Sequence, residues 1–323
     1  MTSEKQNLCF NESMRKKAHI LFRSGNLEGE EELEIAQKYF PCSRLRSHTP
    51  ADSLVIARYS ALPFYNELVK DLETKNSTLI NDLKQHNWIA SFDWYHDLKD
   101  VTPKTWFDHD FYQCTDPGPF VVKGRTNSRK QQWNRLMFAP TKQDAVVIAS
   151  ELMSDPLISE QGIVYRKYIP LRLHEKCPIS GLPYSHEFRC FFYKTELLCF
   201  GYYWSSVSEP HKPAISSKGI EFAKQVAKRA AEHANFFVLD IAEIADQPDE
   251  WTLIEINDGQ QAGPSECDLN MLYSGLADAL AEKPVHGIVT PKPNILAKHQ
   301  MHCPGRPGGP WGGQCNCPAG RVV

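Results

Sequence analysis

Four segments of this chain combine the apolar pattern of a buried strand with ionisable side chains, and this combination restricts the possible folds most. The segments are residues 164–168, 187–192, 237–241 and 251–257. Side chains alternate across a strand, so residues two apart share a face. An unpaired ion inside an apolar strand costs several kcal/mol. The chain must therefore fold so that these charges are neutralised.

The charged and polar side chains of these segments fall on defined faces. They are Arg166 with Tyr168, Glu187 with Arg189, Asp240, and Glu255 with Asn257. In segment 251–257 the alternation places Ile254 and Ile256 on the face opposite Glu255. The apolar face of each strand is expected to enter a hydrophobic core, while the polar face gathers the charges.

Two interpretations of these charges stay open for any single pair. In the first, the side chains pair with each other as internal salt bridges, such as Arg189 with Glu255 or Arg166 with Asp240. In the second, a metal-bound polyphosphate neutralises charges of both signs at once. For the whole set, the second interpretation needs fewer separate assumptions.

The second interpretation assigns a chemical role to each group. Asp240, Glu255 and Asn257 supply two carboxylates and an amide oxygen, an oxygen-only ligand set that suits magnesium. The cations that would meet the phosphates are Lys123, Arg166 and Arg189. The sequence therefore predicts a nucleotide triphosphate site on an antiparallel sheet.

The rest of the chain predicts an α/β (α+β) protein of about two lobes, because 323 residues exceed one small domain. The hydrophobic fraction of 41% and the charged fraction of 23% are typical of a soluble globular protein. We expect an α/β lobe at residues 1–85, a main domain at 86–285 and a flexible tail at 286–323. Ten of the seventeen residues from 304 to 320 are Gly or Pro, too many for a packed core.

Periodicity and cap signals predict the individual elements. Expected strands cover residues 18–23, 54–58, 120–123, 163–169, 187–193, 196–203, 236–244 and 251–256. Expected helices cover residues 28–40, 63–72, 141–154, 218–234 and 269–281. Thr141 and Asp144 form a capping-box pattern at the start of one helix. Residues 88–120 show no clean period and are expected to form a connector.

Composition and charge exclude several classes of function. The chain has no run of 18 apolar residues, so no membrane span is expected. It starts without an apolar signal segment, so a cytoplasmic location is expected. The net charge of −3 argues against a broad nucleic-acid surface. The ten cysteines are scattered, and in the main part of a protein that is not exported they are expected to be reduced thiols.

At these charged segments the chain resembles the ATP-grasp superfamily. The matching motifs are Phe120-Val-Val-Lys-Gly124, Tyr165-Arg-Lys-Tyr-Ile169, Glu187-Phe-Arg189, Asp240 and Ile254-Glu-Ile-Asn-Asp-Gly259. Their order and spacing match over about residues 85–280, and the upstream lobe looks like the pre-ATP-grasp domain. Segments 123–128, 137–139 and 256–261 look like a bacterial and phage clade whose substrates are mostly unassigned. The resemblance implies an ATP-grasp fold with an N-terminal pre-ATP-grasp lobe.

The resemblance also implies a role for each site residue. The residues that would bind ATP are Lys123, Ser128 in the phosphate-covering loop 126–133, the hinge residues Arg166, Lys167 and Tyr168, and Glu187 at the ribose. Arg189 would hold the transferred phosphate, and Asp240, Glu255 and Asn257 would hold one or two magnesium ions. The implied activity is an ATP- and magnesium-dependent ligase that joins a carboxylate to an amine through an acyl phosphate.

The chain departs from the family pattern at two places. Many members carry an acidic residue at the hinge, where this chain has Arg166 or Lys167. The family's earlier ATP-binding lysine has no clear match either. Lys99 and Lys104 are near its expected position but out of register, and Arg58 of the upstream lobe is a candidate substitute.

Two other functions stay open. A nucleotide-binding protein without catalysis would keep Lys123 and Arg189 but would not need three metal-binding groups. The basic loop 125–135, which contains Trp133, suits single-stranded nucleic acid. A ligase acting on a nucleic-acid-tethered substrate is therefore the other alternative. His186, next to Glu187, is a further candidate for substrate contact.

Overall fold

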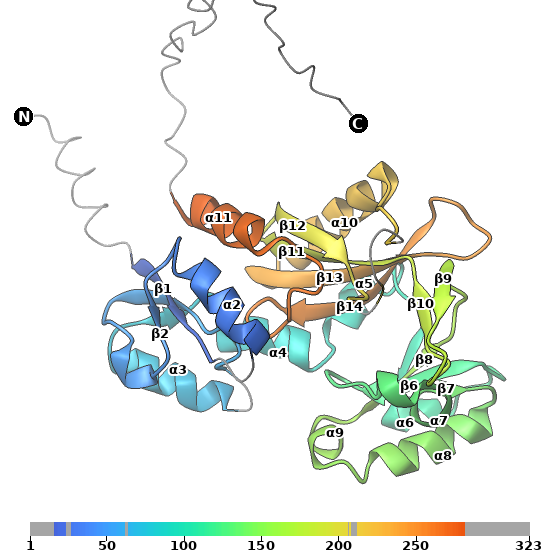
Figure 1. The fold of residues 1–323 in the computed structure, drawn as a ribbon. Coiled ribbons are helices and arrows are strands. Elements are labelled where there is room, and N and C mark those ends of the chain that lie inside the picture. The colour runs from blue at the N-terminus through green and yellow to red at the C-terminus, as the bar shows by residue number, and fades with distance from the viewer. Residues whose placement is uncertain (1–15, 24–26, 62–63, 206, 208–211, 282–323) are drawn as a thin grey trace, which may run out of the picture. The chain divides into compact units, whose positions relative to one another are not determined.

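The computed structural model describes residues 16–23, 27–61, 64–205, 207 and 212–281 (Figure 1). The predicted tail at 286–323 lies outside these residues. Three four-stranded sheets and one two-stranded hairpin organise the described chain, and helices cover the faces of the sheets. This architecture confirms the mixed α/β class that the sequence predicts.

The N-terminal sheet is parallel, with the strand order β2-β1-β3-β4. Its elements are β1 (Lys17–Leu21), α2 (Leu27–Ala36), β2 (Cys42–Ser43), β3 (Ser53–Ile56), α3 (Tyr65–Glu73) and β4 (Thr78–Leu79). The predicted strands at 18–23 and 54–58 and the predicted helix at 63–72 are confirmed. The helix expected at 28–40 ends earlier, because residues 37–40 form turns.

The prediction of an irregular connector at 88–120 is wrong over much of its length. This region contains the end of α4 (Leu83–Ala90), all of α5 (Trp94–Leu98), β5 (Thr105–Phe107) and α6 (Asp108–Phe111). A capping box between Asp82 and Gln85 starts α4. Trp88, Phe92 and Trp94 are buried in the core of the C-terminal sheet. These elements are too short to give a period, so their aromatic residues hid them in the sequence.

The middle sheet is antiparallel, with the order β5-β8-β6-β7. Its further elements are β6 (Phe120–Gly124), α7 (Trp133–Leu136), β7 (Phe138–Ala139), α8 (Lys142–Leu152), α9 (Pro156–Gln161) and β8 (Ile163–Lys167). The predicted capping box is confirmed, because Thr141 and Asp144 each accept a backbone hydrogen bond from the other. Ala145, Ile148 and Leu152 bury the apolar side of α8 in the core of this sheet.

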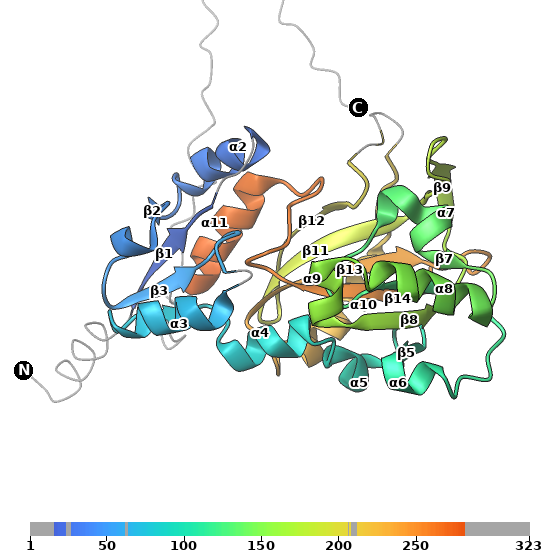
Figure 2. The ribbon, with the colours of Figure 1, turned by 90° about the horizontal axis from the view of Figure 1, so that it is seen from below.

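The C-terminal sheet is antiparallel, with the order β12-β11-β13-β14. Its elements are β11 (Glu187–Tyr193), β12 (Glu196–Tyr202), α10 (Ser217–Ala230), β13 (Phe236–Glu243), β14 (Trp251–Asp258) and α11 (Leu269–Leu280). The predicted alternation is confirmed in β11, where Phe188 and Phe192 pack in the core with α10 and Phe191 packs in the core with α11. Figure 2 shows α11 between α2 and the strands β11 and β12.

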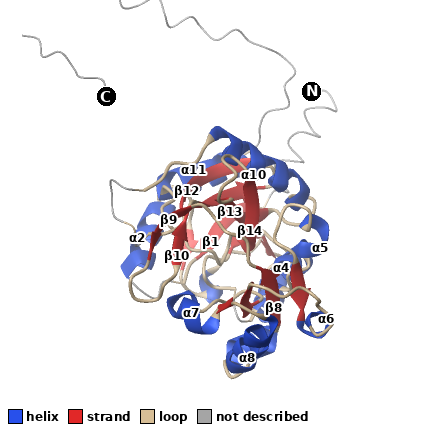
Figure 3. Cartoon of the chain, turned by 90° about the vertical axis from the view of Figure 1, so that its right-hand side faces the viewer, coloured by secondary structure: helices blue, strands red, loops and turns tan. Residues whose placement is uncertain are grey.

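The middle and C-terminal sheets are joined by the backbone that follows β8. Figure 3 shows the strands of both sheets between α8 and α10. On the joining segment, the backbone N–H of Tyr168 donates to Pro119 O at 3.0 Å and that of Arg172 donates to Glu243 O at 2.8 Å. The sequence does not predict the hairpin that follows, β9 (Leu173–Lys176) and β10 (Pro183–Ser185).

Two further properties concern the described residues alone. The cysteines among them are free thiols, as expected for a reduced protein, and they are Cys42, Cys114, Cys177, Cys190, Cys199 and Cys267. In the part of the chain that the structure describes, every helix is too short or too polar to cross a bilayer.

Candidate functional site

A cavity of about 320 Å³ lies where β6, β8, the joining segment, β11 and β14 come together. This volume is within the range of small-molecule sites. The sequence-predicted residues that line it are Lys123, Ser128, Arg166, Lys167, Tyr168, Glu187 and Glu255. Apolar side chains such as Val121, Met137 and Ile254 complete the wall. The cavity therefore combines an apolar surface with charges of both signs.

Lys123 and Glu255 form a salt bridge across the cavity wall, from β6 to β14. Both side chains are largely buried, with exposed fractions of 8% and 13%. Burial disfavours the ionised form of Glu255, but the ammonium groups of Lys123 and Lys130 outweigh this effect and lower its pKa. Glu255 is therefore a carboxylate that is held by cations in the ligand-free protein.

Arg189, Asp240 and Asn257 form a second polar group beside this pair. Arg189 Nε and Nη2 donate to the two Asp240 oxygens at 2.9 and 2.8 Å. Asn257 Nδ2 also donates to Asp240 Oδ2, at 3.0 Å. Burial opposes the charge of Arg189, but Asp240 outweighs this effect and raises the pKa of the guanidinium. These three residues are not among those that line the cavity in the described structure.

Strand register explains which charges pair. Arg189 lies opposite Asp240 in the β11–β13 ladder, and Asp240 lies opposite Glu255 in the β13–β14 ladder. Directly opposed residues have neighbouring side chains on one face. The suggested internal pairs, Arg189 with Glu255 and Arg166 with Asp240, are therefore wrong. The observed pairs are Arg189 with Asp240 and Lys123 with Glu255.

The group that could hold a metal contains two neighbouring carboxylates and one amide. Within the described ranges, no cluster of three His, Cys, Asp or Glu side chains could bind a metal by itself. Asp240, Glu255 and Asn257 nevertheless supply oxygen ligands on adjacent strands, and magnesium commonly completes such a set with water and phosphate oxygens. The donor chemistry fits magnesium, provided that Lys123 and Arg189 release the carboxylates.

Arg166 is held by neutral groups. Its Nη2 donates to Thr102 Oγ1 at 2.7 Å, its Nε donates to Thr105 Oγ1 at 3.2 Å, and its Nη1 donates to the Ile254 carbonyl. Burial lowers the pKa of Arg166 to about 10, against the opposing charge of Glu255. The guanidinium thus brings a buried positive charge to the cavity wall without a salt bridge to any described carboxylate.

The remaining hinge residues differ in what they offer a ligand. Lys167 Nζ is already bound, at 2.6 Å from Asp116 Oδ1 and 2.7 Å from Gly118 O. Tyr168 lines the cavity, as does Ile169. Among the described residues, no acceptor lies within hydrogen-bond distance of the Ile169 backbone N–H. The joining segment therefore has a free backbone donor next to the cavity.

The predicted orientation of Ile254 is wrong. The β13–β14 register shifts between Asp240 and Ile241, so that Glu255 pairs with Asp240 but Leu253 pairs with Ile241. Ile254 is left out of the ladder and lines the cavity beside Glu255. An extra residue of this kind interrupts the alternation on which the prediction depends.

Lys130 is a site residue that the sequence did not single out from its loop. Its ammonium lies 4.0 Å from the Tyr203 ring centroid and 5.2 Å from that of Trp204, and it donates to the Tyr203 hydroxyl. Burial opposes its charge, but Tyr203 and Glu187 outweigh this effect and raise the pKa of Lys130. The only sequence signal was the aromatic pair Tyr203-Trp204 at a strand end, opposite a basic loop.

Glu187 has the most perturbed pKa of the carboxylates that line the cavity. Its side chain is buried on β11, and Ser185 Oγ lies 3.4 Å from its Oε2. Burial raises the pKa of Glu187 to about 7, although the charge of Lys130 opposes this shift. Near neutral pH, Glu187 is therefore poised between its protonated and ionised forms.

The other candidate residues lie away from the cavity. Arg58 is fully buried in a salt bridge to Glu32 at 2.6 Å and also donates to main-chain carbonyls, so it does not replace the missing lysine there. Lys99 is exposed, and Lys104 lies over the Trp106 ring. His186 lies 3.4 Å from Glu243 on the face of β11 opposite Glu187.

Comparison with known proteins adds family information to this geometry. Residues 110–276 match a family model described as an ATP-grasp domain, the third family of its clade. The search of curated proteins found no match. The RimK domain ATP-grasp protein from Sphaerobacter thermophilus DSM 20745 has a similar solved structure, with 12% identity and a TM-score of 0.53. The match covers 81% of this chain and 98% of that chain, which supports a shared fold.

Two other solved structures have lower scores. One is the ATP-grasp ligase PsnB in complex with precursor peptide PsnA2 and AMPPNP, at 11% identity and a TM-score of 0.49, covering 82% of this chain and 96% of that chain. The other is N5-carboxyaminoimidazole synthase from Aspergillus clavatus with ADP and 5-aminoimidazole ribonucleotide, at 12% identity and a TM-score of 0.48, covering 82% of this chain and 77% of that chain. The ATP-grasp resemblance seen in the sequence is confirmed by the family match, which spans more than half of the 323 residues. The chain belongs to this clade family of ATP-grasp domains.

Proposed function

We propose that this protein is an ATP- and magnesium-dependent ligase that joins a carboxylate to an amine through an acyl phosphate. One observation supports the proposal above others. Lys123, Glu255, Asp240 and Arg189 form a row of alternating charges over neighbouring strands, directly beside a cavity of nucleotide size. A magnesium-bound triphosphate would satisfy both signs of charge in that row.

In this proposal the cavity receives the base and ribose of ATP. The Ile169 N–H would donate to the adenine edge, and Glu187 would accept from the ribose hydroxyls. Lys123 and Arg189 would exchange their carboxylate partners for phosphate oxygens. Asp240, Glu255 and Asn257 would then be free to hold magnesium, which would supply charge neutralisation at the phosphates.

The protein's own residues would act by position and charge. A substrate carboxylate oxygen would attack the γ-phosphorus, and the bond to the bridging oxygen would break to release ADP. Arg189 would stabilise the charge on the transferred phosphoryl group. The amine would then attack the acyl carbon and release inorganic phosphate, with loss of one proton from nitrogen. Neither step requires a side-chain nucleophile, and positioning supplies much of the rate.

A second candidate is a nucleotide-binding protein without catalysis. One specific observation favours it: Asp240 and Glu255 are both already neutralised by cations of the same chain. Such pairs are satisfied without a metal, so they can serve the fold alone. A ligase acting on a nucleic-acid-tethered amine stays an alternative within the first proposal, since Lys130 and Trp133 of the basic loop line the cavity.

A trapping experiment distinguishes these candidates. The purified protein is incubated with ATP, magnesium and a panel of carboxylates in the presence of hydroxylamine. An acyl phosphate reacts with hydroxylamine to give a hydroxamate, so hydroxamate formation equal to ADP release would support the ligase. Tight ATP binding without ADP release over a broad panel would favour the non-catalytic candidate.

A further inference from the structure

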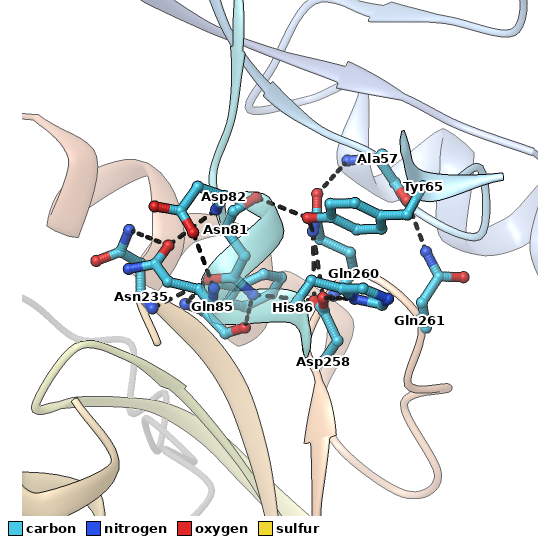
Figure 4. Close-up of polar contacts among 11 residues, drawn as sticks. Ala57, Tyr65, Asn81, Asp82, Gln85, His86, Asn235, Asp258, Gln260 and Gln261 are labelled. Carbon is cyan, nitrogen blue, oxygen red and sulfur yellow. Dashed lines mark hydrogen bonds and ion pairs between the residues drawn. The ribbon is translucent and has the colours of Figure 1, made fainter. Parts of the chain in front are cut away.

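The C-terminal end of β14 is held by a buried polar network (Figure 4). Its centre is Asp258, whose side chain is 4% exposed. Asp258 Oδ1 accepts from Asn81 Nδ2 at 3.0 Å and from the Gln260 backbone N–H at 2.9 Å. Asp258 Oδ2 lies 2.9 Å from His86 Nδ1. Both carboxylate oxygens are therefore fixed by groups that surround them on several sides.

The same network reaches the segments that follow the N-terminal sheet strands. The His86 ring stacks on Tyr65, with ring centroids 3.8 Å apart and an interplanar angle of 10°. The Tyr65 hydroxyl donates to Asn81 O at 2.6 Å and accepts from Gln260 Nε2 at 3.0 Å. Gln260 Oε1 accepts from the Ala57 backbone N–H at 3.0 Å. The N-terminal part of the chain is thus tied to the residues that follow β14.

The position of Asp258 in the strand links this network to the candidate metal ligands. Asp258 follows Asn257 directly, and adjacent strand residues point to opposite faces. Accordingly, Asn257 contacts Asp240 while Asp258 contacts His86. Four residues earlier, the carbonyl of Ile254 accepts from Arg166. The segment with Glu255 and Asn257 is therefore anchored at both ends by residues from outside its own sheet.

This anchoring compensates for the place of β14 in the sheet. β14 is an edge strand, because its only ladder partner in the described sheet is β13. An edge strand lacks a second ladder to fix its position. In addition, the register shift at Ile254 removes one regular pair just before Glu255. The ladder alone therefore constrains this segment weakly, and the Asp258 contacts supply the missing restraint.

We propose that Asp258 is a positioning residue for the metal site. Its carboxylate, fixed by Asn81 and His86, sets the course of β14 so that Glu255 and Asn257 hold their oxygens toward one cation. This inference rests on the proposed function, because it assumes that Asp240, Glu255 and Asn257 bind magnesium. It gives the N-terminal part of the chain a role in metal binding without any contact to the metal.

The test measures metal binding directly, with Mn²⁺ as the probe and ADP present. Free Mn²⁺ is followed by electron paramagnetic resonance in the wild type and in Asp258→Asn. The substitution keeps the size of the side chain but places an NH₂ group against the donors of Asn81 or His86. We expect Mn²⁺ affinity to fall by about tenfold or more, as for other residues that orient metal ligands. Binding of ADP alone, measured by calorimetry, should stay the same.

Tyr65→Phe is the matched control. It removes the hydroxyl contacts to Asn81 O and Gln260 but keeps the three contacts of Asp258. We expect it to lower the melting temperature and to leave Mn²⁺ affinity unchanged. If Asp258→Asn does not fold, His86→Phe replaces it, since that change keeps a ring against Tyr65 and removes one partner of the carboxylate.

The outcomes separate this inference from the proposed function. Wild-type Mn²⁺ affinity in Asp258→Asn, or in His86→Phe where that variant is needed, would overturn the positioning role. So would an equal loss of Mn²⁺ affinity in Tyr65→Phe, because that result would indicate a general effect of stability. If the wild type with ADP binds no Mn²⁺, the proposed metal site itself is wrong and the inference falls with it.

Discussion

Glu187 is expected to make the ligand-free protein less stable as the pH rises from about 4.5 to about 7. Its carboxyl group is buried beside the cavity, and burial raises its pKa to about 7 from an ordinary value of 4.5. In this pH window the folded protein keeps the proton and the unfolded chain releases it. Protons therefore favour the folded state, and stability falls as they are withdrawn.

The size of the effect follows from the two pKa values. Each unit between them is worth about 1.4 kcal/mol, so the full difference is about 3 kcal/mol. Below pH 4.5 both states are protonated, and Glu187 imposes no penalty. Above pH 7 both states are ionised, and the folded state carries the whole penalty of a buried charge that Lys130 offsets only in part.

The assay compares urea unfolding of the wild type and Glu187→Gln at a series of pH values from 4.5 to 8. The variant cannot ionise at this position, so its stability relative to the wild type should rise by about 3 kcal/mol over this range. Other titrating groups contribute equally to both proteins and cancel in the difference. A difference that stays constant to within about 0.5 kcal/mol would refute the reasoning, because it would mean that burial does not perturb this carboxyl.

Three further predictions concern the charged row and its surroundings. Glu255→Gln should abolish ATP turnover but keep the fold, because the amide cannot neutralise Lys123 or replace an anionic ligand; circular dichroism and ADP release check this, with Glu221→Gln on exposed α10 as the control. Arg189→Met should destabilise the protein by about 3–5 kcal/mol by leaving the buried Asp240 carboxylate without its cation, and Arg189→Met/Asp240→Leu should lose less, as measured by urea unfolding. Gly201→Ala should cost about 1–3 kcal/mol in the same assay, because its added methyl group would meet the backbone of the loop before α11.

The sequence predicts those parts of the site that depend on local alternation. The faces of β11 and β13 are correct because both strands have buried apolar residues on one side, such as Phe188 and Leu239, and a charge on the other. The capping box at Thr141 is likewise a local pattern. Such features need only the few residues around them, so the sequence is sufficient.

The parts that the sequence misses depend on register between distant strands. Which cation faces Asp240 is decided by the ladder between β11 and β13, and the order of residues does not specify it. The register shift at Ile254 is equally invisible, since it is defined only against β13. The hairpin β9–β10 lacks an apolar alternation, as residues 173–176 are mostly polar. Lys130 gains its place from Tyr203, more than seventy residues away in the chain.

The ligand-free charge balance supports the view that the row of charges serves a polyanion. The two salt bridges, Lys123 with Glu255 and Arg189 with Asp240, are each neutral. Lys130 and Arg166 remain, and the described structure gives neither of them a salt bridge to a carboxylate. ATP carries a charge of about −4 at neutral pH, which one magnesium ion reduces to about −2. Two cavity cations without carboxylate partners match that remainder, whereas a purely structural network would be expected to pair them as well.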